Sequence, residues 1–324
     1  EKTQEYILKN IEKAIGTKGM IKKLKEMYHN SGHLPTLEEF VNMYEMNLSD
    51  LYKGDNTFTG MCKIVLGQSI QDDSLEKQFT KGLRKLSLID SYSWISNLKE
   101  MLNNNNPISD DDCYALMLYY TFNSDSKIKQ FSSLNEFISF LRYSEYLDEI
   151  LSILKIKNNS INYIELDSGL DIPLKVYSSY TQEQILAGLG LSTFSKECEL
   201  REGVRYLEKQ DIDVFLITLN KNEKEYSANT MYNDYVINEK LFHWESQNKT
   251  TPDKGVGKRY IDRTRQLRTL LFVREYKKQN GQTAPYVFLG RGNYKQHEGS
   301  KPMKVVWEME KEIPPSLIEC STRV

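Results

Sequence analysis

The side chains best suited to molecular recognition lie together in the stretch 231–247. The stretch combines planar rings with hydrogen-bonding groups: Tyr232, Tyr235, Phe242, His243 and Trp244 supply the rings, and Asp234, Asn238, Ser246 and Gln247 supply the polar groups. Rings can stack on a planar heterocycle such as a nucleobase while polar side chains read its edge. Aromatic residues also fill β-barrel cores, where they only pack. The stretch is therefore either the wall of a base-binding pocket or part of a core.

Charge is distributed unevenly along the chain, although the net charge is only -2. Residues 100–171 contain 12 Asp and Glu against 5 Lys and Arg, whereas residues 249–304 contain 14 Lys and Arg against 4 Asp and Glu. A basic segment rich in Arg is typical of a surface that binds a polyanion such as DNA. A solvated face of sheet and loops would give the same composition, so both interpretations stay open.

The sequence motifs of several enzyme classes are absent. There is no GxxxxGK[ST] phosphate loop, and none of the four histidines begins an HxK nuclease motif. His29 and His33 have the spacing of a helical metal pair, but a glycine and a proline beside them break the helix. The acids 110–112 are better explained as the start of a helix at Ser109 than as metal ligands. We therefore predict a chain that recognises a ligand and contains no catalytic residue and no metal site.

Hydrophobic spacing predicts two structural regions. Residues 1 to about 157 are predicted to be helical, because apolar residues recur at spacings of three and four. Later segments, such as 214–218, 269–273, 286–289 and 304–307, are short, β-rich and separated by turn residues, with one helix expected at 181–189. The sequence predicts an α+β protein with an all-α domain at 1–164 and a curled, mainly antiparallel, β-barrel-like domain at 165–324.

Membrane insertion is not expected, because no apolar run reaches the roughly 18 residues that cross a bilayer. The four cysteines form no CxxC pair, so we expect a reducing, cytoplasmic compartment. The chain starts without Met inside a helical pattern, and we expect it to be part of a longer protein.

Five blocks in the second half resemble the C-terminal domain of helicase-nucleases that join a phospholipase-D-like nuclease to a DEAD/DEAH-type helicase. The blocks are 173–180 (PLKVYSSY), 232–247 (with YNDYVIN and FHWESQ), 271–275 (LFVRE), 284–290 (APYVFLG) and 297–307 (beginning HEGSKPM). The resemblance implies a type IV, modification-dependent restriction endonuclease similar to the staphylococcal enzyme specific for 5-methylcytosine. Its C-terminal domain is similar to SRA (SET-and-RING-associated) domains, which have a PUA-like fold and flip a modified cytosine out of the duplex.

The same resemblance implies partners and cofactors. The ligand would be double-stranded DNA containing 5-methylcytosine or 5-hydroxymethylcytosine, and the helical half would connect the reader to helicase and nuclease domains of the same polypeptide. NTP and Mg²⁺ would be needed by the motor domain only, and this chain would hold no cofactor.

The resemblance also implies roles for individual residues. Asp234 would accept a hydrogen bond from the cytosine N4 amine, which favours cytosine over thymine. Tyr232 and Trp244 would sandwich the base, with Tyr235 beside them. Ser246 and Gln247 would read another edge of the base or hold a phosphate. The cations expected to contact the DNA are Arg259, Arg263, Arg265, Arg268, Arg274, Lys295 and His297. Strand alternation would put Tyr232 and Tyr235 on opposite faces, so both can wall one pocket only beside a β-bulge.

Two other functions fit the sequence. A non-specific clamp of a helicase would bind any duplex through the basic face, and its affinity would not depend on base modification. A protein-interaction scaffold would dock through the acidic helical half without binding DNA, and a large apolar patch on the helices would favour it.

Overall fold

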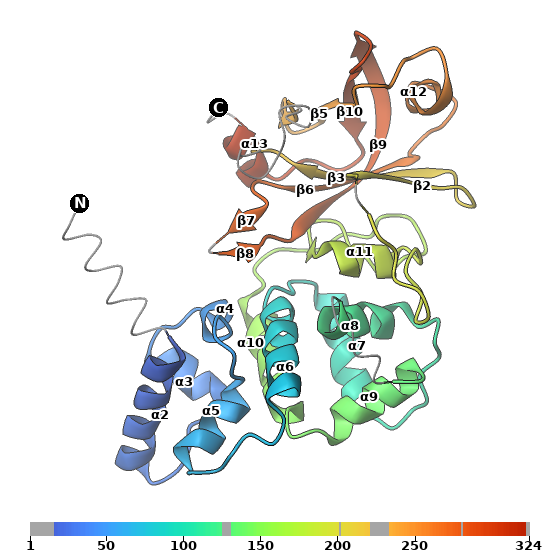
Figure 1. The fold of residues 1–324 in the computed structure, drawn as a ribbon. Helices are drawn as coiled ribbons and strands as arrows, with labels where there is room; N and C mark the ends of the chain where they lie inside the picture. The colour runs from blue at the N-terminus through green and yellow to red at the C-terminus, as the bar shows by residue number, and fades with distance from the viewer. Residues whose placement is uncertain (1–15, 125–130, 201, 221–232, 280, 322–324) are drawn as a thin grey trace, which may run out of the picture. The chain divides into compact units, whose positions relative to one another are not determined.

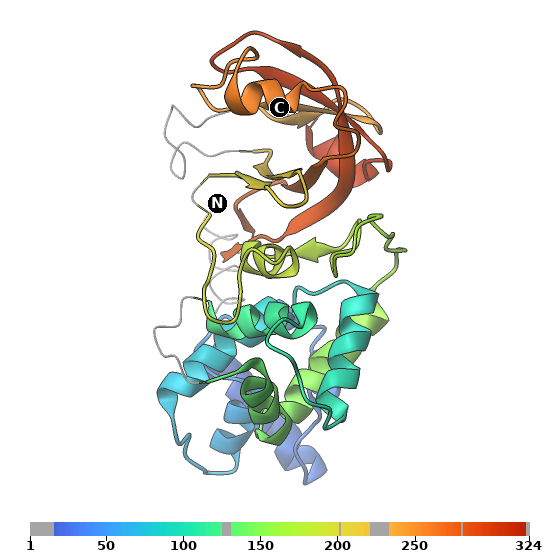
Figure 2. The same cartoon turned by 90° about the vertical axis from the view of Figure 1, so that its right-hand side faces the viewer.

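The computed structural model describes residues 16–124, 131–200, 202–220, 233–279 and 281–321 (Figures 1 and 2). Its internal contacts divide the chain into two compact units. The helical unit is Glu1–Tyr163 with Glu183–Glu197, and the sheet unit is Ile164–Gln182 with Cys198–Val324. The segment 183–197, which the sequence placed in the second domain, thus belongs to the helical unit.

The helical unit consists of short helices. They are α2 (Thr17–Ser31), α3 (Leu37–Met43), α4 (Leu48–Leu51), α5 (Phe58–Val65), α6 (Asp73–Leu86), α7 (Tyr92–Asn103), α8 (Cys113–Asn123), α9 (Leu134–Tyr143) and α10 (Leu147–Ser160), followed later by most of α11 (Gln182–Gly188). Side-chain caps fix several starts, such as the capping box between Thr36 and Glu39 at α3. None of the helices in the described ranges is long and apolar enough to cross a membrane.

The start of α8 differs from the prediction. This helix begins at Cys113 and is capped by Asp112, whose side chain accepts a hydrogen bond from the Ala115 N–H at 2.9 Å. Ser109 therefore precedes the helix, and Asp110 instead accepts from the backbone N–H of Leu134 at 2.7 Å. A carboxylate at the N-cap satisfies a free backbone donor more directly than a serine three residues before the cap.

Two buried glutamates hold the first turn of α5. Glu149 of α10 accepts hydrogen bonds from the backbone N–H groups of Phe58 and Thr59 at 2.8 and 2.9 Å. Glu76 of α6 accepts from the backbone N–H of Thr57 at 2.6 Å. The free N–H groups and positive dipole end of a helix favour carboxylates at this position. Polar contacts inside the core therefore tie α5 to both α6 and α10.

The sheet unit is built on one curled sheet. Its spatial order is β2 (Val204–Leu207), β3 (Ile212–Thr218), β6 (Thr269–Arg274), β9 (Tyr286–Glu298), β10 (Lys304–Met309), β5 (Leu241–Glu245) and β4 (Tyr235–Val236). β1 (Ser179–Tyr180) pairs with β9, β7 (Lys278–Gln279) pairs with β8 (Gln282–Thr283), and the helices are α12 (Gly255–Tyr260) and α13 (Pro315–Ser321).

All neighbouring strands are antiparallel except β3 and β6, which run parallel. Within the described residues, β2 and β4 are the two ends of the path, so the curl does not close into a barrel. The predicted α+β class, with a helical part followed by a mainly antiparallel sheet, is confirmed.

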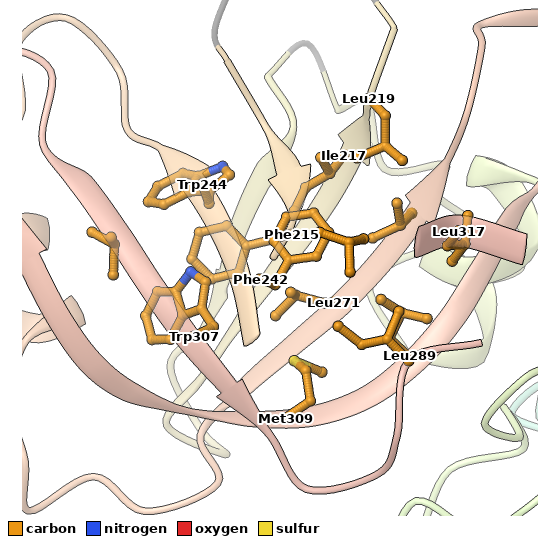
Figure 3. Packing of buried hydrophobic residues seen from close by; sticks show 14 of the residues in the cluster. Phe215, Ile217, Leu219, Phe242, Trp244, Leu271, Leu289, Trp307, Met309 and Leu317 are labelled. Carbon is orange, nitrogen blue, oxygen red and sulfur yellow. The ribbon is translucent and has the colours of Figure 1, made fainter. Parts of the chain in front are cut away.

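The long strand β9 creates the curl. Its first half pairs with β6 and its second half with β10, and the register shifts once in each pairing. Gly290, at the first shift, has a φ of +87°, which a residue with a side chain rarely adopts. Such bulges bend a strand and increase its twist. The sheet therefore wraps around one apolar core, drawn in Figure 3, which includes Phe215, Phe242, Trp244, Leu271, Leu289, Trp307 and Met309.

Candidate nucleic-acid interface

Trp244, one of the two predicted base-stacking residues, lies in the core of the sheet unit (Figure 3). Its side chain is 5% exposed and meets Phe215 edge-on, with ring centroids 4.5 Å apart. Tyr260 of α12 packs against it at 5.4 Å, also edge-on. These are the contacts of a core side chain, which is the second interpretation that the sequence allowed. Tyr232, its predicted partner, lies outside the described residues.

Tyr235 lies on the other face of the sheet. It is the cross-strand partner of His243 and stacks on its ring, with centroids 4.4 Å apart and planes 13° apart. His243 and Trp244 are consecutive in β5, so their side chains point to opposite faces. Tyr235 and Trp244 therefore cannot face the same ligand in this structure.

The polar residues of the stretch make backbone or local contacts. Asp234 is buried and accepts a hydrogen bond from the backbone N–H of Glu245 at 2.9 Å. The Ser246 hydroxyl accepts from the Met303 N–H at 2.9 Å and is fully buried. The Gln247 amide donates to Glu202. These contacts hold the β5 end in place, and the base-pocket role of this stretch stays a prediction.

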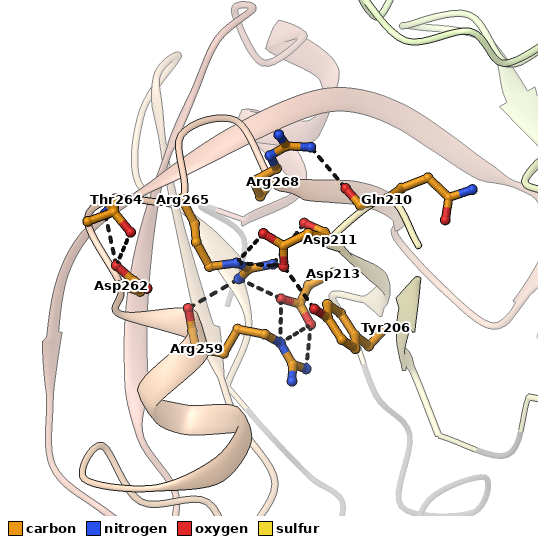
Figure 4. A network of polar contacts seen from close by, with 9 residues as sticks. All are labelled: Tyr206, Gln210, Asp211, Asp213, Arg259, Asp262, Thr264, Arg265 and Arg268. Carbon is orange, nitrogen blue, oxygen red and sulfur yellow. Dashed lines mark hydrogen bonds and ion pairs between the residues drawn. The ribbon is translucent and has the colours of Figure 1, made fainter. Parts of the chain in front are cut away.

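Asp213, fully buried on β3, binds two of the predicted DNA-contacting arginines (Figure 4). Arg259 donates through Nε and Nη2 at 2.8–3.2 Å, and Arg265 donates through Nη1 at 2.9 Å. Arg265 also donates Nε to Asp211 at 3.0 Å, which holds the pKa of that carboxyl below its ordinary value. A buried carboxylate requires such partners because an isolated charge is strongly disfavoured away from water. Arg259 and Arg265 thus neutralise acids of the protein itself.

Arg274 is also turned inward. It is 9% exposed, donates to Thr218 Oγ1 and to the Ala284 carbonyl at 3.0 Å each, and lies over the Tyr286 ring at 4.2 Å. Arg268 is exposed and donates to the Gln210 carbonyl at 2.9 Å. Its charge also helps to lower the pKa of nearby Asp211, after the larger effect of the Arg265 hydrogen bond.

The remaining predicted cations gather around Tyr294 of β9. The Arg263 guanidinium lies over the Tyr294 ring, 4.9 Å from its centroid, and donates to the Lys295 carbonyl at 3.3 Å. The Tyr294 hydroxyl and His297 Nδ1 are 2.7 Å apart. Lys295 pairs with Glu308 of β10 at 2.9 Å, and both side chains are about half exposed. Arg263, Tyr294, Lys295 and Glu308 border a hollow of about 310 Å³ between the segment 262–266 and the strands β9 and β10.

Comparison with known proteins gives one family match. Residues 174–320 match the model of DUF3427, described as a domain of unknown function. The match covers most of the sheet unit, including Asp213 and Tyr294. No curated protein matches the sequence significantly.

Among solved structures, one match is the crystal structure of Arabidopsis thaliana SUVH6 in complex with SAM. The identity is 14%, the alignment covers 76% of this chain and 42% of that chain, and the TM-score is 0.31. The chain thus spans about two fifths of the length of that protein chain.

Sequence reasoning missed the acids that complete these contacts. Asp213 interrupts the apolar strand 212–218, and a carboxylate inside a buried strand implies a cation nearby, so the signal was present. Glu308 and Asn293 face each other across β9 and β10, and no local pattern reveals that pairing. In the part of the chain that the structure describes, no three His, Cys, Asp or Glu side chains gather closely enough to hold a metal ion.

Proposed function

We propose that the sheet unit binds double-stranded DNA and recognises 5-methylcytosine or 5-hydroxymethylcytosine after the base has flipped out of the duplex. The observation that carries the proposal is the gathering of Arg263, Lys295 and His297 around Tyr294, beside a hollow of about 310 Å³. Cations at such a position bind phosphates and orient the duplex, while a ring and amide groups hold a base. A volume near 300 Å³ is at the lower end of small-ligand pockets.

Energetics are compatible with base flipping. Extruding one base costs a few kcal/mol, and stacking the extruded base on a planar side chain returns about 1 to 3 kcal/mol. Contacts between Lys or Arg and the phosphates supply further affinity that falls as salt concentration rises. The exposed cations Arg263, Arg268 and Lys295 suit that role, whereas Arg259, Arg265 and Arg274 bind internal groups.

The wider role rests on the five sequence blocks that resemble helicase-nucleases. In that setting the chain is the target-recognition part of an NTP-dependent type IV restriction endonuclease that attacks foreign modified DNA. The helical unit then transmits recognition to helicase and nuclease domains of the same polypeptide, and NTP and Mg²⁺ act at the motor domain.

A second candidate function is a clamp that binds any duplex. The burial of Trp244 in the core favours it, because a ring packed against Phe215 and Tyr260 is not available for a base. The clamp would use the same exposed cations as the reader but would not distinguish modified from unmodified cytosine.

The test is a binding titration of the chain against matched duplexes that contain cytosine or 5-methylcytosine, at about 0.15 M salt. The reader predicts tighter binding of the methylated duplex, and the difference should persist as salt rises because phosphate contacts are insensitive to the base. Equal affinity for both duplexes would support the clamp. If neither duplex binds, both DNA-binding functions are wrong and the scaffold alternative gains support.

A further inference from the structure

The polar hollow between the segment 262–266 and the strands β9 and β10 has a chemically mixed wall. Arg263 and Gln266 line it from the segment, Asn293 and Tyr294 from β9, and Glu308 from β10. Asn293 and Glu308 are cross-strand partners, so the sheet ladder fixes the distance between them. The hollow therefore has one rigid side that carries both a donor and an acceptor.

A β-bulge shapes that rigid side. In the register of β9 and β10, Lys295 has no facing residue, because Tyr294 and Gln296 face consecutive residues of β10. Bulges re-aim side chains and are frequent beside functional sites. Here the lysine pairs with Glu308 at 2.9 Å and so orients the carboxylate at the wall.

The opposite side of the hollow is held by hydrogen bonds. The Leu267 N–H donates to Asn293 Oδ1 at 2.5 Å, and Arg265 ties the segment to two aspartates (Figure 4). Asp262 accepts from the Thr264 N–H and hydroxyl at 2.9 and 2.7 Å. The segment is thus positioned before any ligand arrives, which lowers the entropic cost of binding.

These contacts leave several polar atoms unused on residues that line the hollow. Asn293 Nδ2 and two of the Arg263 nitrogens are donors with no hydrogen-bond acceptor among the described residues. Glu308 Oε2 and Gln266 Oε1 are acceptors with no donor among the same residues. The hollow therefore offers acceptors and donors side by side.

Cytosine presents the complementary pattern. Its N4 amine donates a hydrogen bond, which Glu308 Oε2 can accept, and its N3 atom accepts a bond that Asn293 Nδ2 can donate. Thymine carries O4 in place of the amine, and this oxygen would face the carboxylate. The wall carries the acids Asp262 and Glu308 as well as the cations Arg263, Arg265 and Lys295, so it offers acceptors that a phosphate site does not need.

We infer that this hollow, rather than the stretch 232–247, holds the flipped cytosine. Glu308 selects cytosine over thymine, and the Arg263 guanidinium on Tyr294 is the surface on which the base stacks, as bases do on guanidinium planes. The inference rests on the proposed function and changes only the residues that hold the base.

Mononucleotides test the hollow without the duplex. The probes are 5-methyl-dCMP, dCMP, dTMP and deoxyribose 5-phosphate, titrated into the 324-residue chain and followed by NMR shifts of β9 and β10. Both cytidine nucleotides should shift these signals, with dTMP binding about tenfold more weakly. Glu308→Gln should abolish that difference. Glu298→Gln should retain it, because Glu298 makes the matching pair with Lys304 at 3.3 Å outside the hollow.

Two results of this titration overturn the inference. Equal binding of all four probes would identify a phosphate site, and the absence of shifts in β9 and β10 would show that no nucleotide enters the hollow.

Duplex binding separates this inference from the proposed function. Weaker binding of the 5-methylcytosine duplex by Glu308→Gln, but not by Glu298→Gln, supports both. Binding that is unchanged in Glu308→Gln and weakened in Asp234→Asn places the base in the stretch 232–247, so the inference is wrong and the function stands. A wild-type chain without any preference refutes the function, while the mononucleotide titration still decides what the hollow binds.

Discussion

At the scale of single residues, the basic character of the segment 249–304 does not translate directly into a DNA-binding surface. Asp213 and Asp211 bind Arg259 and Arg265, and Arg274 donates to groups inside the sheet unit. Arg263, Arg268 and Lys295 remain exposed. A cation contributes to DNA binding only if its charge reaches the phosphates, so this division separates structural from functional arginines.

Replacement of Asp213 should destabilise the sheet unit. Asp213→Asn leaves Arg259 and Arg265 beside a neutral, fully buried amide, and we expect a loss of about 3 kcal/mol in the free energy of unfolding, typical of a broken buried ion pair. Urea unfolding followed by tryptophan fluorescence measures it. Glu208→Gln, at an exposed acid beside β2, is the control and should be neutral. Equal stability of the two variants would contradict a structural role for Asp213.

The exposed cations should determine the salt dependence of DNA binding. Arg268→Ala and Lys295→Ala should each reduce the slope of log K against log salt by about one, because each removes one phosphate contact. The slope is measured by duplex titrations at several salt concentrations. Lys240→Ala, at a lysine that pairs with Glu312 near the β4–β5 turn, should leave the slope unchanged. An unchanged slope in both test variants would mean that DNA does not contact this face.

At the scale of elements, α5 depends on carboxylates supplied by two other helices. Glu149 accepts from two backbone N–H groups of this helix and from the hydroxyls of Tyr52 and Thr59 at 2.8 and 2.7 Å. Both of its oxygens therefore act as acceptors. An isosteric amide can replace only one of them, because its nitrogen is a donor.

Glu149→Gln should loosen the first turn of α5. The amide nitrogen would face a donor, and an unsatisfied buried N–H costs about 1 to 3 kcal/mol. Hydrogen exchange of residues 57–65 should speed up accordingly, since exchange reports local opening. Glu38→Gln, at a partly exposed acid that pairs with Lys155 of α10, is the control and should not change it. Unchanged protection in Glu149→Gln would show that the carboxylate is dispensable.

Stability of the helical unit should also depend on pH through Glu149. Burial raises the pKa of this carboxyl above its ordinary value, although hydrogen bonds from Thr59 and Tyr52 oppose the shift. The fold therefore favours the protonated form of Glu149. Its contribution to the free energy of unfolding is complete below the unfolded-state pKa and is lost as pH rises through the folded-state pKa.

Urea unfolding followed by far-UV circular dichroism, which helices dominate, should show this loss as pH rises above the ordinary pKa of a glutamate, about 4. Nearby Tyr52, Tyr146 and Cys62 have pKa values raised by burial, so these groups stay neutral over this pH range. The buried acid Glu76 is present in both the wild-type chain and the Glu149→Gln variant, so it does not contribute to the difference between them. The loss of stability should be smaller in Glu149→Gln than in the wild-type chain. Identical pH profiles for the variant and the wild-type chain would refute the role of Glu149.

At the scale of the whole molecule, the two units are not consecutive in the chain. The segment 183–197 returns to the helical unit, where Gln184 donates to Thr121 at 2.9 Å and Tyr120 donates to the Thr193 carbonyl at 2.5 Å. Phe194 packs on Tyr119 with ring centroids 5.0 Å apart. A cut at the predicted boundary therefore separates this segment from its partners.

A fragment of residues 165–324 should self-associate. Ile185, Leu186 and Phe194 are buried in the full chain and would become exposed apolar surface, which favours aggregation. Size-exclusion chromatography and dye binding should show association of this fragment but not of the full chain. A fragment in which a Gly/Ser linker replaces 183–197 should remain monomeric. If both fragments associate equally, the segment is not the cause.

Local sequence patterns determined much of this protein. Apolar spacings of three and four identified the helical part, short β-rich runs identified the strands β3, β6, β9 and β10 of the sheet, and the strands 212–218 and 269–274 are buried throughout. These features depend on neighbouring residues, so they can be read along the chain. The exception at α8 is small and arises because three adjacent acids offer several possible caps.

Only the tertiary structure decided which functional side chains are available. Trp244 and Tyr235 lie on opposite faces of the sheet, Asp213 holds two arginines from a segment about fifty residues away, and Glu308 meets Asn293 across a bulged ladder. Strand order, register and the pairing of distant charges are set by non-local contacts, which leave no periodic signal in the sequence. The sequence therefore determined the elements and the basic segment, whereas the fold decided which cations are neutralised and where a polar hollow forms.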